Sequence, residues 1–115
     1  MHMIAARPLA TRLDHLLARR AGARRRLVEP QALAAIAALR LAGAEVELVG
    51  SLARGDFRVN SDVDFLVLAR GPLSETLIFT TICDHLKAAS FDLVFADRLA
   101  PASLEVMRRN AGLRG

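Results

Sequence analysis

Two carboxylates separated by a single residue are the side chains of this 115-residue chain best suited to chemistry. Asp62 and Asp64 stand at the start of an apolar run, and on a β-strand their side chains would lie on the same face. Their Cα atoms would then be roughly 6.5 Å apart, close enough for both carboxylates to reach one cation. Proteins usually hold Mg²⁺ by one or two carboxylates together with substrate phosphates. The pair therefore predicts a magnesium site.

A Gly-Ser turn stands upstream of the carboxylate pair. Gly50 and Ser51 directly follow the apolar run Val46–Val49. The glycine leaves room for a phosphate, and the serine adds a hydroxyl at a place where a short helix can begin. The free N–H groups at a helix N-terminus favour anions. We therefore expect Gly50 and Ser51 to cradle a triphosphate, and the turn and the acid pair together indicate phosphoryl or nucleotidyl transfer.

Other phosphate and metal motifs fit the sequence poorly. A Walker A loop needs Lys followed by Ser or Thr after its last glycine, whereas Gly55 precedes Asp56 and Phe57. The chain has no G-x-G-x-x-G, H-E-x-x-H or C-x-x-C motif. An EF-hand loop would need another oxygen ligand where Leu66 stands, which argues against calcium. A lone Gly-Ser pair is often only a turn and a lone acid pair is often only solvated, so the prediction rests on their order and spacing.

The complete pattern resembles the signature of the minimal nucleotidyltransferases of the polymerase-beta-like superfamily. The matching residues are Gly50-Ser51-x-Ala53-Arg54-Gly55-Asp56 and Ser61-Asp62-x-Asp64-x-x-Val67. The resemblance extends from about Leu33 to about Gly112. It implies a nucleotidyltransferase fold, in which a small mixed β-sheet is flanked by α-helices, with ATP as substrate and two Mg²⁺ ions as cofactors.

The resemblance also implies roles for single residues. Asp62 and Asp64 would bind the metal ions, and Asp92, in the later apolar run Phe91–Phe95, would complete the site. Asp92 would serve as a metal ligand and as a candidate base for the acceptor's proton. Gly50, Ser51 and Arg54 would bind the nucleotide. Two interpretations of Arg54 stay open, because its charge can assist the phosphates or pair with an acid such as Asp56 and brace the turn.

Stand-alone proteins of this kind are typically antitoxins encoded beside a HEPN-domain ribonuclease toxin. The resemblance implies that this chain transfers AMP from ATP to a tyrosine hydroxyl of such a toxin. One alternative is an antitoxin that neutralises its partner by binding without catalysis. Another is nucleotide transfer to a small-molecule acceptor, and a non-specific RNA-binding protein is a further alternative.

Charge divides the chain into two parts. Residues 1–28 contain seven Arg and one acid, Asp14, for a net charge of +6, whereas residues 29–115 contain nine basic and eleven acidic residues, for −2. We therefore expect a basic N-terminal arm over 1–28, which the spacing of its leucines predicts to be helical, and a separate body over 29–115, for which the resemblance implies a minimal nucleotidyltransferase domain. The arm can be a solvated helix face, a contact surface for an acidic protein, or a nucleic-acid contact. No aromatic residues interleave with its arginines, which argues against direct nucleic-acid binding.

The hydrophobic periodicity predicts the order αα-β-β-α-β-α, an α/β fold. The first helix is expected from Pro8 to Ala21, ending at Gly22, and a basic connector, Arg24–Arg26, leads to a second helix from Pro30 to about Gly43. Strands are expected at 45–49, 63–68 and 91–95, and further helices at 74–88 and 101–109.

The sequence also predicts where the protein is located. It has a single cysteine, no apolar run of about 20 residues and no signal-peptide pattern. We therefore expect a cytoplasmic protein with no membrane span.

Overall fold

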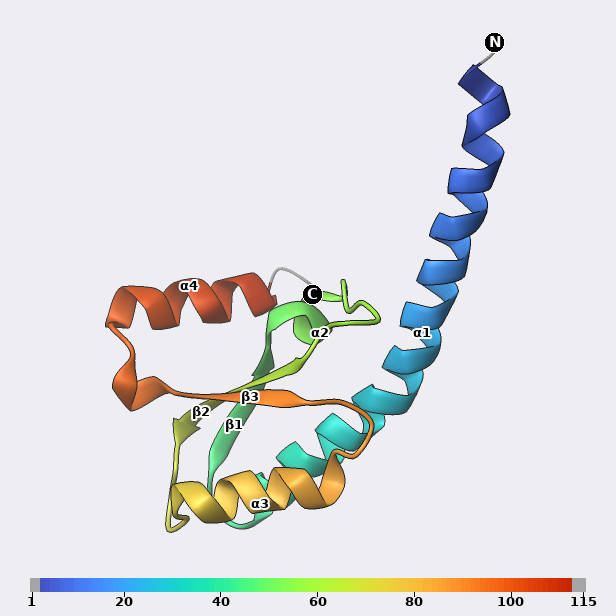
Figure 1. Ribbon diagram of the computed structural model, residues 1–115. Helices are drawn as coiled ribbons and strands as arrows, with labels where there is room; N and C mark the ends of the chain where they lie inside the picture. The colour runs from blue at the N-terminus through green and yellow to red at the C-terminus, as the bar shows by residue number, and fades with distance from the viewer. Residues whose placement is uncertain (1–2, 113–115) are drawn as a thin grey trace.

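The computed structural model describes residues 3–112 and contains a three-stranded sheet with helices on both faces (Figure 1). The predicted α/β class is therefore confirmed. The elements in chain order are α1 (Met3–Leu41), β1 (Glu45–Val49), α2 (Gly50–Arg54), β2 (Val63–Ala69), α3 (Glu75–His85), β3 (Phe91–Phe95), the 3₁₀ helix η1 (Ala96–Arg98) and α4 (Pro101–Gly112).

The sheet has the strand order β1-β2-β3 and is mixed. β1 pairs antiparallel with β2, and β2 pairs parallel with β3. α3 and the C-terminal half of α1 cover one face of the sheet, whereas α2 and α4 lie on the other (Figure 1). The two faces therefore have different environments, and alternating residues of β2 divide between them.

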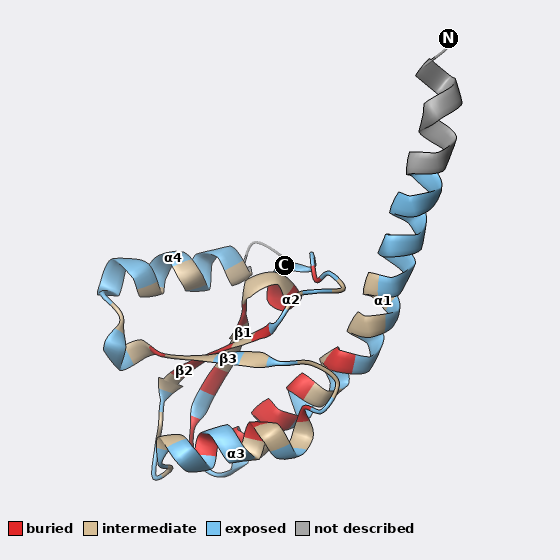
Figure 2. Ribbon diagram, viewed as in Figure 1, coloured by how far each residue is buried: buried red, intermediate tan, exposed pale blue. Residues whose placement is uncertain are grey.

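The hydrophobic core lies between the sheet and the helices α1 and α3 (Figure 2). β2 contributes Val63, Phe65 and Val67 to this core, and all three are at most 2% exposed. Leu39 of α1 and Ile78 of α3 are fully buried against them. Because Val63, Phe65 and Val67 occupy the core face, the intervening positions of β2 face α2 and α4.

The prediction of two N-terminal helices was wrong, because α1 is one continuous helix of 39 residues. Gly22 does not end it, since a glycine inside a helix costs only about 1 kcal/mol relative to alanine. Pro30 removes one backbone hydrogen bond from the helix. It is nevertheless accommodated because Val28 and Ala32, on either side of it, are fully buried in the core. Tertiary packing thus outweighs the helix-breaking signal at Pro30, whereas the signal at Gly22 is weak by itself.

The N-terminal half of α1 projects away from the sheet (Figure 1). A 39-residue helix is about 58 Å long at 1.5 Å per residue. Leu13 and Leu17 on the projecting part are 55% and 41% exposed. Among the described helices, α1 included, none combines the length and the apolarity that crossing a membrane would require.

The remaining elements follow the expected boundaries closely. β1 and β3 match, and Ser74 caps α3 by accepting a hydrogen bond from the backbone N–H of Leu77 at 3.1 Å. α3 ends earlier than expected, at His85, because the N–H groups of Lys87 and Ala88 donate instead to Oε1 of Gln31 on α1, at 2.8 and 2.9 Å. α4 continues to Gly112, beyond the expected end at 109, and residues 113–115 lie outside the described part of the chain.

Candidate active site

The register of the parallel pair β2–β3 brings two of the predicted carboxylates together. Asp64 and Asp92 are direct partners across the two strands, and neighbouring strands are about 4.8 Å apart. Both side chains lie on the face opposite the core, the face that carries α2 and α4. Asp64 is half-buried and Asp92 is exposed. Two acids that are 28 positions apart in the sequence thus lie side by side near the starts of neighbouring strands.

Asp62 lies just before β2 and is tied to the loop that precedes β3. Its Oδ1 accepts a hydrogen bond from the hydroxyl of Ser90, and the carbonyl of Ser90 accepts one from the N–H of Val63 at 3.0 Å. These two bonds join the start of β2 to the start of β3. Sequence analysis missed Ser90, although its place two residues before Asp92 puts it on the same face and could have drawn attention to it.

The pKa of the Asp64 carboxyl is raised above the ordinary aspartate value. Partial burial is the largest cause, followed by the negative charges of Asp92 and Asp62, while the positive charge of Arg54 lowers it. The carboxylate of Asp64 is therefore close enough to the other two acids to be affected by their charges. A bound cation would reverse this unfavourable interaction.

Gly50 is held against the carboxylate of Asp64. Its φ angle is +73°, in the left-handed region that favours glycine. A Cβ atom added at this position would overlap Oδ2 of Asp64 and lie 2.9 Å from its Cγ. The glycine at the start of α2 therefore gives the carboxylate its space, in addition to the room for a phosphate inferred from the sequence.

Ser51 and Arg54 lie on the five-residue helix α2, next to the acids. The carbonyl of Ser51 accepts hydrogen bonds from the N–H groups of Gly55 and Asp56, at 2.9 and 3.0 Å, which close the helix. Nε of Arg54 lies 3.5 Å from Oδ1 of Asp56. The positive charge of Arg54 also lowers the pKa of Asp64, so Arg54 acts on Asp56 and on Asp64 at the same time.

The loop that carries Asp62 is clamped by an arginine of α1. Nη1 of Arg24 donates to the carbonyls of Arg58 and Ser61, at 3.0 and 2.7 Å. The same guanidinium lies 4.9 Å from the ring centroid of Phe57, a cation–π arrangement. The segment expected to be a basic connector is therefore helical, and Arg24 fixes the backbone directly before Asp62. Sequence analysis missed this contact because it joins residues 34 and 37 positions apart.

These side chains fit a Mg²⁺ ion whose remaining ligands come from a substrate. Within residues 3–112, no three His, Cys, Asp or Glu side chains form a group that could hold a metal ion. A complete protein cage is not what Mg²⁺ requires, since it is usually bound by one or two carboxylates and the phosphates of its substrate. Asp64 and Asp92, with Asp62 beside them, supply oxygen ligands only, which Mg²⁺ prefers.

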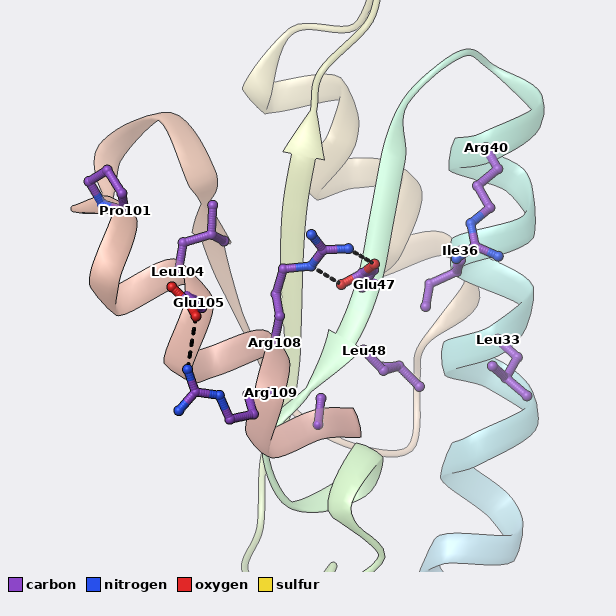
Figure 3. Close-up of a pocket in the computed structure, with 11 residues that line it drawn as sticks. Leu33, Ile36, Arg40, Glu47, Leu48, Pro101, Leu104, Glu105, Arg108 and Arg109 are labelled. Carbon is purple, nitrogen blue, oxygen red and sulfur yellow. Dashed lines mark hydrogen bonds and ion pairs between the residues drawn. The ribbon is translucent and has the colours of Figure 1, made fainter. Parts of the chain in front are cut away.

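Two hollows flank α4. One, of about 560 Å³, adjoins Gly50, Arg54 and Asp64 and continues beneath α4. The other, of about 800 Å³, lies between α1, β1 and α4 and contains none of the three aspartates (Figure 3). In it, Arg108 of α4 donates to both carboxylate oxygens of Glu47 on β1, at 3.1 and 2.9 Å. Of these two hollows, only the smaller is lined by one of the aspartates, Asp64, whereas in the larger the Glu47–Arg108 pair anchors α4 to the sheet.

Comparison with protein-family models finds a match for this chain. A protein-family model described as a nucleotidyltransferase domain matches residues 31–106, a span that contains α2 and all three aspartates. No curated protein and no solved structure matches the chain.

Gly50→Ala should damage the site through Asp64. The left-handed backbone costs a residue with a Cβ atom about 1–2 kcal/mol, and the added carbon displaces the carboxylate. We expect roughly 10- to 100-fold weaker Mg²⁺ binding in the presence of a nucleotide, measured by calorimetry. Gly22→Ala is the matched control, since its Cβ would make only an ordinary 3.6 Å contact with Arg26. Unchanged Mg²⁺ binding by Gly50→Ala would contradict the contact.

Asp64→Asn should stabilise the metal-free protein at neutral pH. Because the folded state raises the pKa of Asp64, the fold loses stability as pH rises through that pKa, and the amide removes this loss. Urea unfolding over a pH series should show a gain for Asp64→Asn at neutral pH that disappears in acid. Asp84→Asn, on the exposed side of α3, is the control. A destabilised Asp64→Asn at neutral pH would refute the electrostatic argument.

Arg24→Ala should loosen the loop before Asp62. Losing hydrogen bonds from a charged donor should cost about 1.5–3 kcal/mol in urea unfolding. We also expect weaker Mg²⁺ binding, partly rescued by Arg24→Lys, because a lysine retains the charge but not the planar fork. Arg20→Ala, an exposed arginine four residues earlier on α1, serves as control. Equal effects of Arg20→Ala and Arg24→Ala would show that only the charge of the arm matters.

Proposed function

The chain belongs to the nucleotidyltransferase domain family, and we propose that it is a Mg²⁺-dependent antitoxin that transfers AMP from ATP to a tyrosine of a HEPN ribonuclease toxin. The observation that carries the proposal is the convergence of Asp64 and Asp92, with Asp62 beside them, next to the Gly-Ser turn. The family supports nucleotidyl transfer in general, and the choice of acceptor rests on the resemblance of the motif to the stand-alone minimal nucleotidyltransferases.

In the proposed reaction, the oxygen of the acceptor hydroxyl attacks the α-phosphorus of ATP. The bond from that phosphorus to the bridging oxygen of the β-phosphate breaks, and pyrophosphate leaves. The hydroxyl proton passes to a carboxylate, for which Asp92 is the candidate because it is exposed beside Asp64. Holding the two reactants in line contributes much of the rate enhancement in such a reaction.

Each residue of the site has a task in this scheme. The first N–H groups of α2 and the hydroxyl of Ser51 bind phosphate oxygens, and Arg54 adds positive charge beside them. One or two of the carboxylates of Asp62, Asp64 and Asp92 would hold Mg²⁺ together with phosphate oxygens of the nucleotide. The ion would polarise the phosphoryl group and neutralise charge on the leaving oxygen. Ser90 and Arg24 fix the position of Asp62 through the hydrogen bonds described above.

The projecting part of α1 supports a protein as partner. It exposes Leu13 and Leu17 among arginines such as Arg12 and Arg19, far from the core. An exposed apolar strip flanked by positive charge suits an acidic protein surface. The same feature favours the alternative function, in which the chain neutralises its partner by binding alone.

The test is intact mass spectrometry of the protein encoded beside this chain, after incubation with the chain, ATP and Mg²⁺. We expect mass increments of one or more AMP units on the partner, and peptide mapping should locate them on a tyrosine. The variant Asp62→Ala/Asp64→Ala should abolish the increments, and Asp84→Ala should leave them unchanged.

The outcomes separate the candidate functions. A stable complex without added mass, and with toxicity still suppressed by Asp62→Ala/Asp64→Ala, would establish neutralisation by binding and refute the enzymatic proposal. Added mass that persists in the double variant would show that these aspartates do not carry the reaction.

A further inference from the structure

The smaller hollow extends the site past the carboxylates. Gly50, Arg54 and Asp64 line it on one side, and Val94 of the sheet and residues of helix α4 complete the lining. Its volume of about 560 Å³ falls within the roughly 300–1,000 Å³ of typical ligand pockets. Any molecule bound at the carboxylates and the Gly-Ser turn therefore has an adjoining cavity into which its remainder can extend.

One face of α4 forms the wall of this cavity. Ser103, Val106, Met107 and Asn110 line it, at the three- and four-residue spacing of a single helix face. The opposite face of α4 is fastened to β1 by the two hydrogen bonds of the Glu47–Arg108 pair. The wall is thus held in place by contacts outside the cavity.

The lining is unsuited to phosphates. Among the described residues that line it, Arg54 is the sole cation, and it already pairs with Asp56. Apart from Arg54, Asp64 and Gly50, the lining is formed by apolar side chains and two small uncharged polar ones. Phosphates should therefore remain at the Gly-Ser turn, and the cavity suits an uncharged, flat and partly apolar group.

The individual side chains match a heterocyclic base. Val106 is 48% exposed, and Val94 lies on the sheet opposite α4. The thioether of Met107 can make favourable contacts with an aromatic ring. The carboxamide of Asn110 offers a donor and an acceptor side by side, which can pair with the edge of a purine.

We propose that this cavity holds the nucleobase of the nucleotide, with Val94, Val106 and Met107 against the ring and Asn110 at its edge. The inference rests on the proposed nucleotidyl transfer and adds to it the subsite that selects the base. It makes α4 the part of the chain that distinguishes one nucleotide from another, while α2 and the aspartates bind what all nucleoside triphosphates share.

Calorimetry with two probes tests the inference. ATP carries a base, whereas inorganic tripolyphosphate reports only on the phosphate and Mg²⁺ sites. Val106→Trp should fill the cavity and weaken ATP binding roughly 10- to 200-fold while tripolyphosphate binding stays unchanged. Glu105→Trp is the matched control, because Glu105 lies on the other face of α4 and its side chain is 72% exposed. Asn110→Ala should reduce the preference between ATP and GTP.

Each result supports or overturns the assignment. If Val106→Trp leaves ATP binding intact, or weakens both probes equally, the base does not occupy the cavity. Intact ATP binding combined with lost transfer to the acceptor would assign the cavity to the acceptor instead. If the unaltered chain binds neither probe in the presence of Mg²⁺, the proposed function fails together with this inference.

Discussion

The repulsion that Asp92 and Asp62 exert on the carboxylate of Asp64 is the interaction around which the candidate site is organised. Two unit charges 4 Å apart repel by about 4 kcal/mol at an effective dielectric constant of 20. The parallel register of β2 and β3 nevertheless fixes Asp64 beside Asp92. Much of the surrounding structure offsets or orients these charges, through Arg54 near Asp64 and the Ser90 hydroxyl on Asp62. The fold thus keeps an unfavourable charge arrangement that a cation can make favourable.

The core is what makes this arrangement possible. Val63, Phe65 and Val67 are buried against α1 and α3, and their alternation with Asp64 directs the acid to the opposite face. A slip of β2 by one residue would place the carboxylate in the core and the valines at the site. The apolar residues that stabilise the domain therefore also determine which way its chemical groups point.

The sequence predicted those parts of the protein that follow from local patterns. The strands, the Gly-Ser turn, the acid pair and the cap at Ser74 each have a signal within a few residues, and the strands and the cap appear as expected. The continuity of α1 through Pro30 could not be predicted, because it depends on packing against distant residues. The hydrogen bonds from Arg24, the capping of the segment after α3 by Gln31 and the cavity under α4 could not be predicted either. Each of them depends on how separate elements lie against one another.

The contact between Gly50 and Asp64 links two positions that a sequence alone would treat as separate motifs. Because a side chain at position 50 and a carboxylate at position 64 compete for the same space, the two positions cannot vary independently. In a related domain with a larger residue at the position of Gly50, we expect a smaller or uncharged residue at the position of Asp64. Loss of both residues together would identify related domains that have no catalytic activity and act only by binding.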